Sequence, residues 1–87
     1  MHRTFMLKTP HMRGDDVAEF QDDLNARYAA WHINKQIVKD DDYGQATHDA
    51  AVEVCTCLGI DAKTAMQHGV DPDLRIKIRH PDKRTPH

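Results

Sequence analysis

The feature that most constrains this chain is an acidic turn between two segments with apolar faces. The turn is residues 40–47, Asp-Asp-Asp-Tyr-Gly-Gln-Ala-Thr, and the two segments are 17–28 and 47–58. Three consecutive aspartates cannot be core, because unpaired buried charges are too costly, so they form either a solvated loop or a site. We therefore expect the two apolar faces to pack together, with the aspartates at the surface where the chain turns.

The segment before the turn has the spacing of an amphipathic helix. It follows Gly14, and acids at 15, 16 and 19 fall in its first turns, where the helix dipole favours negative charge. Its inward stripe recurs at helical spacing and comprises Val17, Phe20, Gln21, Leu24, Asn25 and Tyr28. Two members of this stripe, Gln21 and Asn25, are polar, and a buried amide needs hydrogen-bond partners.

The segment after the turn predicts a second helix that begins near Gln45 and ends before Gly59, a residue suited to a left-handed C-terminal position. On a helix Cys55 and Cys57 point about 200° apart, so we expect Cys55 inside, Cys57 outside and no bridge between them. The inward stripe is Thr47, Ala50, Ala51, Val54, Cys55 and Leu58.

The rest of the chain gives weaker signals. Trp31 belongs to a loop expected to pack on the core, and Asp61 can cap a short third helix over 62–68. Asp71-Pro72 could start another helix, yet Leu74, Ile76 and Ile78 alternate like a strand. We expect extended chain here, pairing with residues 4–7 of an N-terminal arm.

Length and charge limit the classes of function. A chain of 87 residues makes one domain, and no apolar run approaches the roughly 18 residues of a membrane span. We therefore expect a soluble protein with no membrane partner. Residues 14–74 carry thirteen acids and four bases, a net charge of −9, whereas both ends are basic. An acidic body repels phosphate, so we expect no nucleic acid on it.

No catalytic or metal-binding constellation stands out. The seven histidines are scattered, without two ligands at i and i+4, and the acidic turn lacks the alternating pattern of a calcium loop. No nucleophile, base and orienting group can be assigned. The sequence therefore predicts neither catalytic residues nor a metal or other cofactor.

Two patterned segments carry a family resemblance. The first is Gly14-Asp15-Asp16-Val17-x-x-Phe20-Gln21-x-x-Leu24-Asn25; the second is Asp40-Asp41-Asp42-Tyr43-Gly44-Gln45-Ala46-Thr47-x-x-Ala50, followed by Leu58-Gly59-Ile60. In order and spacing they resemble the peptidoglycan-binding-domain-like (PGBD-like) family. The tail, 78–86, resembles segments that follow such modules in actinobacteriophage lysis proteins.

The resemblance implies roles for particular residues. Family members use the glutamine at Gln21 to tie down loop backbone. Their glycine is replaced here by Asp41, which tolerates a positive φ less easily. Their apolar residue before the turn is replaced by Lys39, so Ile37 or Val38 must supply that core contact.

The fold that the resemblance implies is mainly α, a small three-helix bundle with short extended arms at both termini. Residues 1–13 would be an N-terminal arm, 14–70 the three-helix peptidoglycan-binding-like domain, and 71–87 a basic C-terminal tail or linker.

The function it implies is a non-catalytic cell-wall binding module of a bacteriophage lysis protein. Such a module is made in the host cytoplasm and acts at the cell wall, with peptidoglycan or a partner hydrolase domain as its partner. The alternative is a phage virion or assembly protein (minor capsid, decoration or tail component) that reuses the fold for protein–protein contacts, acidic bodies pairing with basic ends. A small hydrolase is disfavoured by the missing catalytic set.

The candidate ligand surface lies at the acidic turn. Asp40, Asp42 and Gln45 could hydrogen-bond sugar hydroxyls and peptide amides, Tyr43 could offer an aromatic face, and Arg13 could add a charge. Backbone amides at the start of the second helix would favour a carboxylate or a carbonyl group. The competing interpretation is a solvated capping turn with no ligand.

Overall fold

A long helix and the chain that returns along it organise the molecule. The computed structural model describes residues 4–67 and 69–79, and these contain four helices and one two-stranded sheet. The mainly α prediction is confirmed, although these residues contain four helices where three were predicted. In chain order the elements are β1 (Met12–Arg13), α1 (Asp15–Ala30), β2 (Asp42–Tyr43), α2 (Gln45–Cys57), α3 (Ala62–Ala65) and α4 (Pro72–Arg79).

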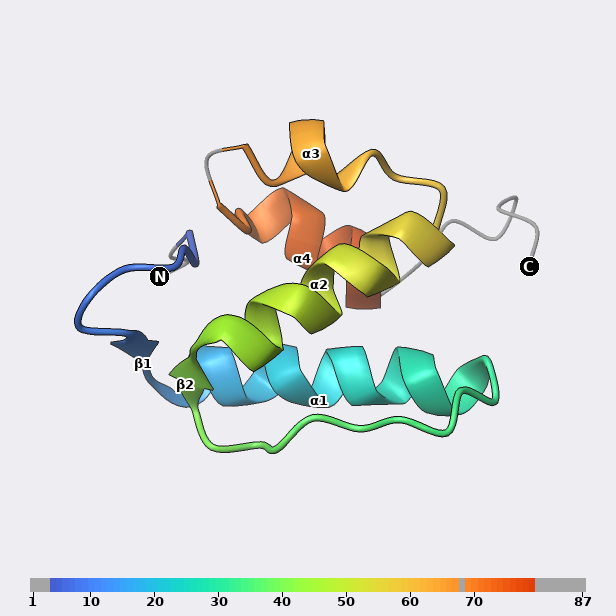
Figure 1. The fold of residues 1–87 in the computed structure, drawn as a ribbon, viewed down its shortest axis with the longest axis horizontal. Helices are drawn as coiled ribbons and strands as arrows, with labels where there is room; N and C mark the ends of the chain where they lie inside the picture. The colour runs from blue at the N-terminus through green and yellow to red at the C-terminus, as the bar shows by residue number, and fades with distance from the viewer. Residues whose placement is uncertain (1–3, 68, 80–87) are drawn as a thin grey trace.

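The helices stack above α1. In Figure 1, α2 crosses over α1, α4 lies behind α2, and α3 lies beyond them at the top of the view. Both α2 and α4 contact α1. The predicted end of the third helix at 68 and the tail beyond 79 lie outside the described residues.

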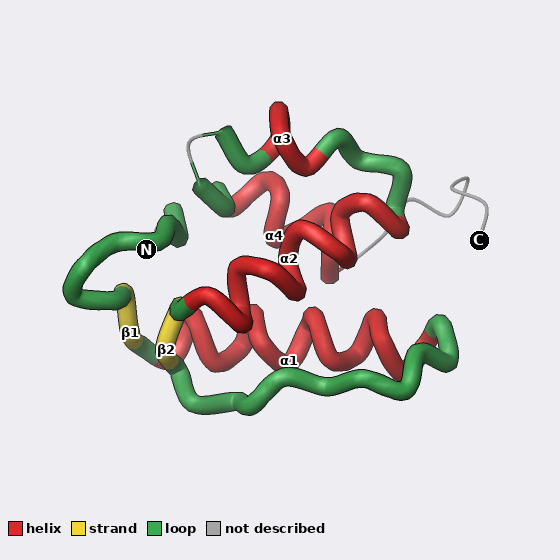
Figure 2. The backbone as a smooth tube through the Cα atoms, viewed as in Figure 1, coloured by secondary structure: helices red, strands yellow, loops and turns green. Residues whose placement is uncertain are grey.

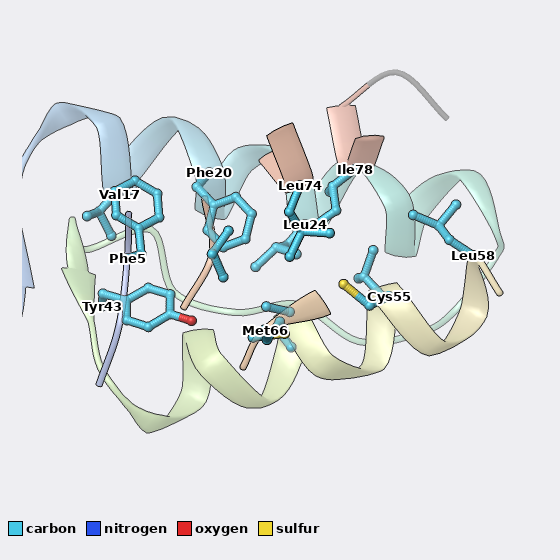
Figure 3. Packing of buried hydrophobic residues seen from close by; sticks show 14 of the residues in the cluster. Phe5, Val17, Phe20, Leu24, Tyr43, Cys55, Leu58, Met66, Leu74 and Ile78 are labelled. Atoms are coloured by element: carbon cyan, nitrogen blue, oxygen red, sulfur yellow. The ribbon is translucent and has the colours of Figure 1, made fainter. Parts of the chain in front are cut away.

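The predicted apolar stripes form the core. The α1 stripe is buried apart from half-buried Asn25, and the α2 stripe is buried throughout. Cys55 lies in this core and Cys57 is exposed, as predicted. Figure 3 shows side chains from α1, α2, α4 and the N-terminal segment meeting in one cluster.

The prediction of extended chain at 74–78 is wrong, because these residues belong to α4. The Asp71 carboxylate caps this helix by accepting a hydrogen bond from the Leu74 amide at 2.8 Å. Leu74 and Ile78, one helical turn apart, are buried, whereas Ile76 is 59% exposed. The cap and the i, i+4 spacing therefore outweigh the alternating pattern. Residues 71–79, expected to begin a tail, pack on α1.

The predicted partner of the N-terminal arm is also wrong. Phe5 forms an antiparallel bridge with Val70, not with 74–78, and the Phe5 amide donates to the Val70 carbonyl at 2.8 Å. Gly69 permits this contact: its φ is +101°, and a Cβ there would lie 2.4 Å from the Phe5 carbonyl oxygen. The bridge places the Phe5 ring in the core, 5.5 Å from the Phe20 ring.

The segment from 31 to 41 returns along α1 to the start of β2, as the green tube in Figure 2 shows. Asn25 holds it by both amide atoms, donating to the Ile37 carbonyl at 3.0 Å and accepting from the Ile37 amide at 2.8 Å. Ile37 packs against the core while Val38 is exposed, so Ile37 supplies the predicted contact. Trp31 is half-buried against the same core.

Candidate functional site

The buried side chain of Gln21 holds the acidic turn in place. Its Oε1 accepts a hydrogen bond from the Asp41 amide at 3.0 Å. Its Nε2 faces three oxygens: the Thr47 hydroxyl at 2.9 Å, Asp40 Oδ1 at 3.0 Å and the Asp42 carbonyl at 3.2 Å. The predicted role of Gln21 in tying down loop backbone is therefore confirmed, and it reaches the first turn of α2 as well.

Asp41 adopts the left-handed conformation that a glycine would adopt most easily, with φ +57°. Its side chain accepts from Arg13 Nη2 at 3.2 Å, and its carbonyl accepts from the Gly14 amide at 3.2 Å. Aspartate is among the few residue types that enter this region at modest cost. Aspartate therefore occupies this positive-φ position in the turn.

The short sheet brings the side chains of Arg13 and His11 to the turn. In the β1–β2 register Arg13 lies opposite Asp42. Arg13 Nη1 lies 3.8 Å from Asp42 Oδ2, and His11 Nδ1 lies 2.8 Å from Asp42 Oδ1. Arg13, expected to add a charge for a ligand, thus already pairs with the carboxylates of Asp41 and Asp42.

A shallow open pocket of about 220 Å³ lies beside the turn. Three of the five predicted site residues, Asp40, Asp42 and Gln45, line it together. Val38, Gly44, Ala46 and Thr47 complete its wall. The pocket therefore combines carboxylate oxygens with the first turn of α2, where no side chain caps the helix.

The Tyr43 side chain does not contribute an aromatic face to this pocket. The residue is fully buried, and its ring lies 5.7 Å from the ring of Phe5 and 6.4 Å from that of Phe20 (Figure 3). Its hydroxyl lies 3.1 Å from His48 Nδ1 rather than in the pocket. Burial raises the pKa of this hydroxyl well above its usual value. Tyr43 anchors the turn to the core, and the expected contact with a sugar ring is not available.

Asp40 is held in its charged form. The hydrogen bond from Gln21 is the main reason that the pKa of this carboxyl lies below its usual value, and the Asp42 amide adds a second hydrogen bond at 3.1 Å. Because Asp40 remains exposed, it can still accept from a ligand.

Two other hollows lie at the surface. One, of about 310 Å³, is lined by Leu7, Lys8, Thr9, His11 and Gln45, so Gln45 borders both it and the pocket beside the turn. The other, of about 420 Å³, lies between α1 and the returning segment. Its lining is Asn25, Ala29, Ile33, Asn34, Lys35 and Gln36.

Within 4–67 and 69–79, no three His, Cys, Asp or Glu side chains are arranged to hold a metal ion. No helix in the same ranges is long and apolar enough to cross a bilayer.

Comparisons with protein-family models, curated proteins and solved structures found no match to this chain.

Sequence reasoning missed His11 as a member of the site. It precedes Asp42 by 31 residues, and the register of β1 against β2 brings the two together. The alternating apolar residues before Pro10, Phe5 and Leu7, gave no indication that His11 pairs with Asp42. The structure thus brings together Asp40, Asp42 and Gln45, sets Arg13 beside them and removes Tyr43 to the core.

Proposed function

We propose that this chain is a non-catalytic cell-wall binding module of a bacteriophage lysis protein, with a PGBD-like arrangement of α1, the acidic turn and α2. The observation that carries the proposal is the Gln21 network. A family-type glutamine joins the backbone of 41 and 42 to Thr47, and the pocket beside that network is lined by Asp40, Asp42 and Gln45. The proposed partner is peptidoglycan.

The chemistry of the pocket suits a ligand that both donates and accepts hydrogen bonds. Asp40 and Asp42 are acceptors, whereas the uncapped first turn of α2 presents amide donors. Sugar hydroxyls and peptide amides combine both kinds of group. The exposed Val38 side chain at the rim adds an apolar contact. A shallow pocket of this kind is expected to bind weakly and to rely on the many copies of the ligand in a wall.

Co-sedimentation with purified bacterial sacculi tests the proposal. We expect the wild-type chain to sediment and Asp42→Asn to lower its apparent affinity about tenfold, as expected when a hydrogen bond worth about 1.4 kcal/mol is lost. Gln45→Ala should lower the affinity less, because the Gln45 amide donates to Asp49 and the substitution removes mainly the stem that lines the pocket. Matched controls are Asp73→Asn on α4 and Gln67→Ala after α3, both exposed and remote from the pocket. A thermal melt of each variant separates lost binding from lost folding.

Two results would count against the proposal. Sedimentation that is insensitive to Asp42→Asn and Gln45→Ala would place the wall-binding face elsewhere on the chain. No sedimentation of the folded wild-type chain would remove wall binding altogether and favour the virion or assembly protein.

A further inference from the structure

The pocket beside the acidic turn adjoins a second hollow, which is lined by Lys8. Gln45 lines both hollows, and His11, which lines the second, is hydrogen-bonded to Asp42, which lines the first. We call the two hollows together the Gln45 groove. The shared side chain and the 2.8 Å contact between His11 and Asp42 place the two hollows side by side.

The groove is polarised along its length. One end carries the Asp40 and Asp42 carboxylates, and the other carries Lys8. Lys8 pairs with no carboxylate among residues 4–67 and 69–79. Asp40 accepts hydrogen bonds from neutral donors, the Gln21 amide and the Asp42 backbone, and the nearby Arg13 adds a weaker attraction that also lowers the pKa of this carboxyl.

Uncharged side chains lie in the middle of the groove and border each of its charged ends. Gln45 turns its amide towards Asp49, donating from Nε2 at 2.7 Å, and leaves its aliphatic stem between the two hollows. Leu7 borders the end with Lys8, and Val38 borders the end with the aspartates; both are exposed. A ligand for the whole groove thus needs opposite charges joined by an aliphatic stretch.

We propose that the Gln45 groove recognises a wall peptide through a diamino acid that keeps one free amine and one free carboxylate. Asp40 and Asp42 take the amine, Lys8 takes the carboxylate, and the aliphatic stem of the diamino acid crosses Gln45. The inference rests on the proposed wall binding and names the part of the wall that is bound. Under this proposal, binding requires both the charged amine and the charged carboxylate of the ligand.

The test is titration of the full chain with three soluble muropeptides. The first keeps the free amine and free carboxylate of the diamino acid, the second has that amine acetylated, and the third has that carboxylate amidated. We expect the first to bind at least about tenfold more tightly than either of the others, because each modification removes one charge-assisted contact.

Variants assign the two ends of the groove. Lys8→Gln should bind the free and amidated carboxylate forms alike but keep its preference for the free amine. Asp42→Asn should show the reverse pattern. Lys63→Gln on α3, which is exposed and does not line the groove, should behave as the wild type.

The outcomes separate the two proposals. If the chain sediments with sacculi but binds the three muropeptides equally, or binds none of them, wall binding stands and recognition of the diamino acid is overturned. The assignment to Lys8 is likewise overturned if Lys8→Gln keeps the wild-type preference for the free carboxylate. If neither sacculi nor muropeptides are bound, both proposals fail.

Discussion

The α1–α2 hairpin and the segment from 59 to 79 are held by different kinds of interaction. In the hairpin, the side-chain amides of Gln21 and Asn25 bind the backbone of Ile37, Asp41 and Asp42. Gln21 also donates to the Thr47 hydroxyl at the start of α2. The later segment is held mainly by burial of Leu74 and Ile78, together with the backbone bridge between Phe5 and Val70 beside Gly69 and the ion pair between Arg79 and Asp23. Directional bonds fix the position of polar groups, whereas apolar burial fixes only which face is inside. The candidate site lies on the part held by directional bonds.

The largest effect is expected where the later segment meets Phe5. Gly69→Ala places a Cβ 2.4 Å from a backbone oxygen at a φ of +101°, so both a clash and backbone strain oppose folding. We expect a loss of about 4 kcal/mol, from strain and overpacking together. Gly59→Ala is the control, because its φ is +78° and nothing lies within 4 Å, so only about 1 kcal/mol should be lost. Urea unfolding measures both, and equal losses would contradict the close contact.

The next effect distinguishes helix from strand in α4. Ile78→Ala removes a fully buried side chain and should cost about 3 kcal/mol, whereas Ile76→Ala, at a residue 59% exposed, should change stability by less than about 0.5 kcal/mol. A strand with 74, 76 and 78 on one buried face would make the two losses similar. Thermal or urea unfolding of the pair decides between these structures.

A smaller loss of stability is expected in the hairpin when hydrogen bonds are removed while the side-chain volume is nearly kept. Gln21→Met keeps an unbranched side chain but leaves the Asp41 amide, the Asp42 carbonyl and the Thr47 hydroxyl without this partner. We expect a loss of about 2 kcal/mol. Leu24→Met, one turn away and equally buried, is the control and should cost less than about 1.5 kcal/mol. Hydrogen exchange should accelerate at the Asp41 amide in Gln21→Met alone; unchanged protection there would contradict the network.

The smallest effect concerns acid stability. The folded-state pKa of Asp40 lies below its unfolded value of 3.8, chiefly because Gln21 donates to it. Its contribution is therefore fully present above about pH 4 and is lost as the pH falls through the folded pKa. Asp40→Asn should flatten the dependence of unfolding free energy on pH below that point. Urea unfolding at a series of pH values measures the slope, and parallel curves for wild type and Asp40→Asn would contradict the account.

Sequence patterns predicted the hairpin well because its local signals agree. The stripes of α1 and α2 followed from spacing and residue type, whereas the backbone partners of Gln21 and the positive φ at Asp41 followed from the family resemblance. The prediction of extended chain at 74–78 failed because a helix cap at Asp71 competed with an alternating pattern that includes exposed Ile76.

The candidate site was predicted in part for a similar reason. Asp40, Asp42 and Gln45 are close in the chain, so their meeting in one pocket could be foreseen. Tyr43 packs its ring against Phe5 in the core, so the aromatic face expected for a ligand is not available. His11 depended on the register of β1, which no local pattern encodes.

The most direct measurement of the central claim is an amide chemical-shift map of the full chain as soluble peptidoglycan fragments are added. The account predicts saturable shifts concentrated in 38–47, on the surface that Gln21 holds, with little change at α3 and α4. Shifts concentrated at 33–36, in the hollow of about 420 Å³, or along α4, or none at all with the fragments in excess, would contradict it.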